Sequence, residues 1–320
     1  MNFIFGIIFE KLFPFICKYI RPFMKWFLHT FTRLCELQRI CYGAQPGARR
    51  TKQVEWSLES SRQPDIKQLI RELDEAVEFC SEDELKSLTL RAVNVVQRVK
   101  KIKPSANPDF APLFGVSVYQ IWSYKRLMHQ VERLRSEQYN AENIEHEEKL
   151  MELWRHLMPD EPLTERVSKQ WQEIGFQGED PKTDFRGMGL LGLENLLYFS
   201  REYKEAAQHV LLHSRHPTLG YTFAIVGINL TAMAYVLLKS GDAKAHFYNV
   251  AQNAKRACSL EHFHKFYCYL LFEFDRFWLE SEPTNIMDFR EIYQTFEISI
   301  LEALHKDSNV FKTNLVIEKV

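Results

Sequence analysis

Apolar residues recur every three or four positions along most of this 320-residue chain, a spacing that predicts an all-α fold. Ser81 and Glu84 have the spacing of a capping box at the start of one such stretch. No period of about 20 to 50 residues repeats, so a solenoid is not supported. Helices are predicted over about 64–80, 82–99, 116–135, 142–157, 189–214, 244–256, 263–278 and 286–304, with a short helix capped by Thr164 before residue 174.

One predicted helix lacks a polar face. The 23 residues between Arg215 and Lys239 contain no Asp, Glu, Lys or Arg, and a stretch of this length could span a bilayer. Pro217, Gly220 and the amphipathic helices on both sides, which need an apolar partner, favour a different interpretation. We predict that this stretch is the central core helix of the domain.

Composition shifts divide the chain into parts. Residues 43–63 are rich in glycine and serine and have no periodicity, so we interpret them as a flexible linker. Three prolines mark a second break over 100–112. We expect a helical extension over 64–135 that packs on a main helical domain over 136–310, and a loose tail over 311–320. Charged positions of the helix at 142–157, such as Glu147, are interpreted as its solvated side.

Residues 1–42 are dense in aromatic and aliphatic side chains but are interrupted by charges, and the longest uncharged run has nine residues. A transmembrane helix needs about twenty. The first fifty residues also carry eight Lys or Arg against two acids. This composition favours a segment that lies in a membrane interface, with cations near anionic lipid. The alternative is a hydrophobic helix that packs on the main domain.

The rest of the chain limits the possible partners and cofactors. Residues 51–320 carry 33 basic against 40 acidic side chains, which argues against nucleic acid as the main partner. Six scattered cysteines fit reduced thiols in a cytosolic protein. His209 and His213 are one turn apart but have no evident third ligand, so we expect no metal site. Residues 187–192 match G-x-G-x-x-G without the strand that a dinucleotide site requires.

An irregular polar stretch interrupts the helical pattern before residue 189. Gly175, Gly178 and the Asp180-Pro181 pair break the periodicity, so residues 176–186 are predicted to form a loop. Arg186 then lies directly before a buried helix. A guanidinium on a loop held at both ends loses little entropy on meeting an anion, and its donors suit phosphate oxygens. The alternative is a structural ion pair of Arg186 with Asp180 or Asp184.

The same stretch resembles the signature of the ELMO (engulfment and cell motility) domain. Its ending, TDFRGMGLLGL, is most similar to the small ELMO-domain-containing proteins. The resemblance implies an all-helical ELMO domain, here over 136–310, that acts as a GTPase-activating protein for Arf and Arf-like GTPases. The matching positions include Trp171, Gly175, Phe176, Asp180, Pro181, Asp184, Arg186, Gly187, Gly189 and Asn195.

The family's key arginine corresponds to Arg186, which we expect to act on a partner's nucleotide. No cofactor of its own is expected, because the GTPase carries both GTP and magnesium. Gln177 is predicted to orient the attacking water or the switch region, Asp184 to hold the guanidinium, and Asn195 to tie the loop to the helix.

Such a protein would work on the cytosolic face of the endoplasmic reticulum, Golgi, lipid droplet or mitochondrion, with part of it in the cytosol. Two alternatives remain open at this stage. One is a non-catalytic scaffold that binds small GTPases or exchange-factor complexes, and the other is a lipid-binding protein that uses only the N-terminal segment.

Overall fold

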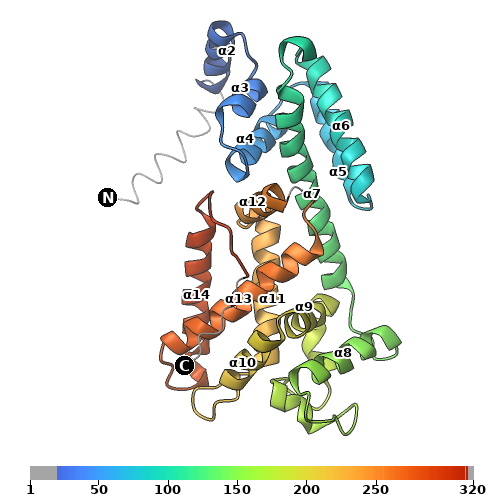
Figure 1. The fold of residues 1–320 in the computed structure, drawn as a ribbon, viewed down its shortest axis with the longest axis vertical. Coiled ribbons are helices and arrows are strands. Elements are labelled where there is room, and N and C mark those ends of the chain that lie inside the picture. Colours follow the sequence, from blue (N-terminus) through green and yellow to red (C-terminus); the bar gives the residue numbers. More distant parts are fainter. Residues whose placement is uncertain (1–19, 255, 314, 316–320) are drawn as a thin grey trace. The chain divides into compact units, whose positions relative to one another are not determined.

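The computed structural model describes residues 20–254, 256–313 and 315 (Figure 1). These residues form α-helices and 3-10 helices without a strand, which confirms the all-α prediction. The described chain divides into two compact units, one made of residues 20–76 and 81–121 and the other of 77–80 and 122–315. Residues 1–19 of the predicted membrane segment, which spans residues 1–42, lie outside the described residues.

Several helices of the first unit are joined by polar pairs in addition to its buried apolar side chains. Thr51 of α4 and Gln120 of α7 are hydrogen-bonded, and Arg91 of α6 pairs with Glu72 of α5. The predicted capping box is present, because Ser81 and Glu84 bond each other's backbone N–H. Its helices are α2 (Arg21–Thr32), α3 (Glu36–Gly43), α4 (Ala48–Glu59), α5 (Pro64–Val77), α6 (Glu82–Val99), η2 (Pro104–Ala106) and the start of α7 (Phe110–Ser136).

Helix α4 corrects our prediction of a flexible linker over residues 43–63. Its inward face contains the apolar Val54 and Leu58 together with the polar Thr51 and Glu55, and all four side chains are buried. Polar residues at half of the inward positions hide the periodicity in the sequence. Helix α7 also begins earlier than predicted, because Pro112 lies in its first turn, where the missing N–H has no helical partner to lose.

The second unit is built around α9, which packs against α8, α10, α11, α13 and η4. Ten of the fourteen residues of α9 are buried. The helices of this unit are the rest of α7, α8 (Ile144–Leu157), η3 (Lys169–Ile174), η4 (Pro181–Arg186), α9 (Gly189–Glu202), α10 (Lys204–Ser214), α11 (Phe223–Ser240), α12 (Lys244–Ala254), α13 (Leu260–Glu280), η5 (Ile286–Asp288) and α14 (Phe289–Leu304).

Helix α11 is the predicted core helix. Among the described residues, it alone has the length and apolar composition of a membrane span. It packs against α9, α10 and α13, and 61% of its 18 residues are buried. Its position within the helical unit agrees with a core helix whose neighbours need an apolar partner.

Three boundaries in this unit differ from our predictions. Tyr203 leaves the helical conformation and separates α9 from α10, a break that no glycine or proline announces. The short helix before residue 174 is η3, and its N-cap is Ser168 instead of Thr164. The tail is not loose at Phe311, whose buried ring stacks on Tyr269 with the centroids 4.4 Å apart. Aromatic stacking therefore extends the packed domain beyond residue 310.

Candidate functional site

The irregular segment before α9 is attached to the helical core at two glycines. Gly175 has φ +85° and Gly189 has φ +54°, a region that favours glycine. A Cβ on Gly175 would collide with the backbone at Phe223, and one on Gly189 would collide with the Arg135 carbonyl. The segment is therefore clamped against the start of α11 at one end and the end of α7 at the other.

Aromatic side chains beneath the segment hold it between the two glycines. Trp171, Phe176 and Phe185 are at most 2% exposed and contact one another in order, with ring centroids 5.8 and 5.6 Å apart. Trp154 of α8 adds an edge contact to Trp171, and Tyr139 contacts Phe185. These packed rings fix the backbone that carries Arg186.

Residues 181–186, which we predicted as part of an irregular loop, form the 3-10 helix η4. Asp180 is its N-cap and accepts a hydrogen bond from the Lys182 N–H, while Pro181 occupies the first position. The proline and capping aspartate that break an α-helical pattern are also good starters of a short helix. Arg186 is thus the last residue of a helical turn.

The Arg186 side chain is exposed. Its Nε–H donates to the Thr183 carbonyl at 2.8 Å, which anchors the base of the guanidinium. Within the part of the chain that the structure describes, no carboxylate is paired with it. Its two terminal nitrogens point to no protein acceptor among these residues, so they are available for an anion from outside.

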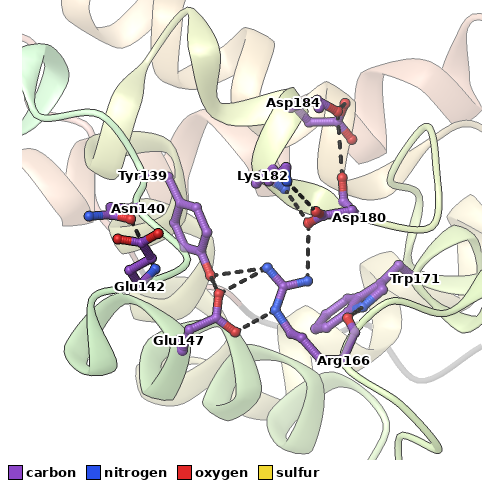
Figure 2. A network of polar contacts seen from close by, with 10 residues as sticks. Tyr139, Asn140, Glu142, Glu147, Arg166, Trp171, Asp180, Lys182 and Asp184 are labelled. Atoms are coloured by element: carbon purple, nitrogen blue, oxygen red, sulfur yellow. Dashed lines mark hydrogen bonds and ion pairs between the residues drawn. The ribbon is translucent and has the colours of Figure 1, made fainter.

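A second arginine, Arg166, bonds two carboxylates, and Figure 2 shows this network. Its guanidinium forms a two-pronged contact with Glu147 of α8, whose Oε1 lies 2.9 Å from Nη2, and donates to Asp180 Oδ1 at 3.1 Å. The Tyr139 hydroxyl donates to the same Glu147 carboxylate at 2.5 Å. Glu147 is therefore a structural partner, which corrects its assignment to a solvated helix side.

Electrostatics support the charged form of this network. Partial burial opposes ionisation of Glu147, but hydrogen bonds from Arg166 and Tyr139 outweigh it and lower the pKa of Glu147. Burial opposes ionisation of Asp180 as well, and hydrogen bonds from Lys182 and Arg166 lower its pKa. Both carboxylates thus remain ionised and hold Arg166, so Asp180 already has its cation.

The three predicted supporting residues occupy different places. Gln177 is exposed on the same segment as Arg186. Asp184 does not hold the guanidinium in this structure, because its Oδ2 accepts the Gln177 backbone N–H at 2.9 Å. Asn195 is fully buried, and its side chain joins Thr231 of α11 at 3.1 Å and His264 of α13 at 2.7 Å, so it links helices instead of tying the loop to α9.

Gly187, unlike Gly189, does not need to be glycine for its local geometry. Its φ is negative, and a Cβ there would meet nothing within 4 Å.

His209 and His213, which are one helical turn apart, do not form part of a metal site among the described residues. His213 pairs with the buried Asp275 at 2.8 Å, and His209 contacts the His213 ring. The described residues contain no group of three or more His, Cys, Asp or Glu that could hold a metal ion.

Sequence reasoning did not single out Arg166, although it precedes the signature by only a few positions. Its network joins residues of α7–α8 to the segment before α9, and no short spacing in the sequence brings them together. The sequence showed the polar segment before α9, but it did not show that Arg166 pairs with Glu147 and Asp180.

Comparison with known proteins places this arrangement in a family. Residues 129–293 match the model of the ELMO/CED-12 family. The chain is 43% identical over 307 residues to "ELMO domain-containing protein 1" of Pongo abelii, covering 91% of this chain and 90% of that protein. It is 44% identical over 295 residues to "ELMO domain-containing protein 2" of Homo sapiens, covering 92% and 95%. It is 35% identical over 280 residues to "ELMO domain-containing protein B" of Dictyostelium discoideum, covering 86% and 92%. The resemblance noted in the sequence is thereby confirmed, and this chain belongs to the ELMO/CED-12 family.

Proposed function

We propose that this protein accelerates GTP hydrolysis by Arf or Arf-like small GTPases, with Arg186 supplied in trans. The observation that carries the proposal is that the Arg186 guanidinium is exposed and has no carboxylate partner among the described residues. It is exposed and anchored through Nε at 2.8 Å, and its neighbour Asp180 is already paired with Arg166. Family membership links the chain to regulation of small GTPases.

This arrangement suits the chemistry of phosphoryl transfer. Negative charge spreads over the oxygens of the transferred group in the transition state, and a guanidinium from a partner stabilises it by roughly 10³ to 10⁵ in rate. A preorganised side chain loses little conformational entropy on docking. In the proposal, the GTPase brings GTP and magnesium, and this chain needs no cofactor of its own. Gln177, exposed on the same segment, is proposed to contact the attacking water or the switch region.

The proposed place of action is the cytosolic face of an intracellular membrane. Support comes from the end of the N-terminal segment that the structure describes. Phe23, Trp26 and Phe31 of α2 are 59%, 63% and 83% exposed, although such large rings are usually buried in a soluble domain. Leu37 and Cys41, by contrast, are buried in the first unit. The proposed contact with the membrane therefore includes α2 and excludes the inward face of α3.

A single-turnover hydrolysis panel across Arf and Arf-like GTPases tests the activity. The wild-type chain is expected to accelerate at least one GTPase, and Arg186→Lys is expected to abolish the acceleration because lysine lacks the planar fork. Arg290→Lys, at an exposed arginine of α14, is the matched control and should remain active. Binding of a GTPase without acceleration by the wild type would instead support the non-catalytic scaffold.

A further inference from the structure

A cavity of about 410 Å³ lies within the first unit, between α2, α3 and the connection from α4 to α5. Its size falls within the range of small-molecule sites. Lys25 and His29 reach it from α2, one turn apart, and Arg39 reaches it from α3. Ser57, at the end of α4, also lines the cavity, and its hydroxyl donates to Glu36 Oε2 at 2.7 Å.

The lining is strongly cationic. Among the described residues around the cavity, Lys25, Arg39, Arg62 and Lys100 are basic and Glu36 alone is acidic. Lys25 already neutralises Glu36, since its Nζ lies 2.5 Å from Oε2. Arg39 donates to the Leu34 carbonyl at 2.6 Å, and no described carboxylate pairs with Arg39, Arg62 or Lys100. Three cations therefore face one cavity without a counter-ion from the described chain, which indicates an anion site.

An apolar helix face adjoins this cavity. The side chains at positions 20, 23, 24, 27 and 31 of the α2 region share one face by their three- and four-residue spacing, and each is at least 42% exposed. The rings of Phe23, Phe27 and Phe31 stack in sequence, with centroids 6.4 Å apart at each step. Trp26 belongs to both features, because it lines the cavity, is 63% exposed and contacts Phe23. A helix with an apolar outer face and cations beside it is typical of a membrane interface.

We propose that the cavity binds the phosphomonoester headgroup of an anionic phospholipid while the aromatic face of α2 lies among the acyl chains. A phosphomonoester carries nearly two negative charges and three acceptor oxygens, which suits several unpaired cations and an arginine fork. The inference rests on the membrane-facing part of the proposed function and is independent of Arg186.

Vesicle co-sedimentation of the full chain tests the charge requirement. The vesicles contain phosphatidylcholine alone, phosphatidylcholine with phosphatidylserine, or phosphatidylcholine with phosphatidic acid, the last two matched for total negative charge. Wild type is expected to prefer phosphatidic acid, which alone offers a phosphomonoester. Arg62→Gln combined with Lys100→Gln should weaken this binding about 30-fold. Lys67→Gln with Lys103→Gln removes the same charge outside the cavity and should change it less than about threefold.

A second pair of variants tests the apolar face. Phe27→Ser with Phe31→Ser should lower binding to every vesicle type, whereas Leu90→Ser, at a residue 66% exposed on α6, should leave it unchanged. Glycerol 3-phosphate in solution should compete only weakly, because it lacks acyl chains.

Four outcomes would overturn the proposal. The first is equal binding of the wild type to vesicles with phosphatidylserine and to vesicles with phosphatidic acid, and the second is an equal loss of vesicle binding in the cavity variant and its control. The third is binding of glycerol 3-phosphate as tight as binding to vesicles. The fourth is a dimer of the chain that forms without vesicles and that Phe27→Ser dissociates. Hydrolysis with a soluble GTPase and no vesicles should be normal in all these variants, so failure of this site is separable from failure of the proposed activity.

Discussion

Arg166 and Arg186 lie in one irregular segment between α8 and α9, yet their surroundings are opposite. Arg166 is 27% exposed and is shared between Glu147 and Asp180, whereas Arg186 is exposed and bonds one backbone carbonyl among the described residues. Both are equally charged, so the difference comes from which carboxylates the fold places within reach. Arg166 pairs with Asp180, one of the two acids that the sequence offered as a partner for Arg186, and the other, Asp184, accepts the Gln177 backbone N–H. Among the described residues, no carboxylate pairs with Arg186.

The largest effect is expected from removing the exposed guanidinium. Arg186→Ala should lower stimulated GTP hydrolysis by about 10³-fold or more, because a guanidinium acting in trans supplies that much rate. GTPase binding and the thermal melt should be nearly unchanged, since the side chain contributes one exposed hydrogen bond. Added guanidinium ions should restore part of the rate if the side chain enters the nucleotide site. Loss of GTPase binding in this variant, with no rescue, would assign Arg186 to ordering the docking segment instead.

The next effect concerns the two glycines beside Arg186. Gly189→Ala should destabilise the domain by about 3 kcal/mol, because it combines a positive φ with a collision against the Arg135 carbonyl. Gly187→Ala should change stability by less than about 0.5 kcal/mol, since its φ is ordinary and the space around it is open. Denaturant unfolding measures both. A large loss in Gly187→Ala would show that the end of η4 is more constrained than its geometry indicates.

Removing the structural arginine is expected to cost stability. Arg166→Gln leaves Glu147 and Asp180, which are 22% and 21% exposed, without their shared cation, so we expect a loss of about 2 kcal/mol. Arg201→Gln breaks a pair whose members are each 47% exposed and should cost less than about 0.5 kcal/mol. Equal losses from the two variants in urea unfolding would contradict the distinction between a structural and a surface pair.

The smallest expected effect is the pH dependence of the stability that Arg166→Gln loses. The pKa values of Glu147 and Asp180 are lowered in the folded protein, so their stabilisation is present above their unfolded pKa values and disappears as pH falls through the folded ones. The stability difference between wild type and Arg166→Gln should therefore be constant from neutral pH to about 5 and shrink below about 4. Subtracting the two proteins cancels other acid effects, including that of the buried His264, whose pKa burial lowers to about 4. A difference that grows on acidification would contradict the assignment of these carboxylates.

The helices were predictable to the extent that their own inward residues are apolar. The long uncharged stretch predicted α11, and Ser81 with Glu84 predicted the start of α6. Helix α4 was missed because Thr51 and Glu55 occupy inward positions, where a sequence pattern counts them as exposed. The packing of Phe311 was missed because one aromatic residue in a tail has no period.

The candidate site was predictable in identity but not in its bonding. Gly175, the Asp180-Pro181 pair and Gly189 located the segment between the helices, and the family resemblance directed attention to Arg186. The bonds of Asp184, Asn195 and Glu147 could not be derived in this way. Asn195, for example, bonds residues 36 and 69 positions away in the sequence, on helices whose rotation depends on all their neighbours.

The sequence by itself determined the helical class, the core helix and the position of the irregular segment, because periodicity and backbone restrictions are local properties. Only the tertiary structure decided which arginine is neutralised, since a charge is paired by whatever acid lies within about 4 Å in space. For Arg166 the acids are Glu147 of α8 and Asp180, and for Arg186 the described chain supplies none.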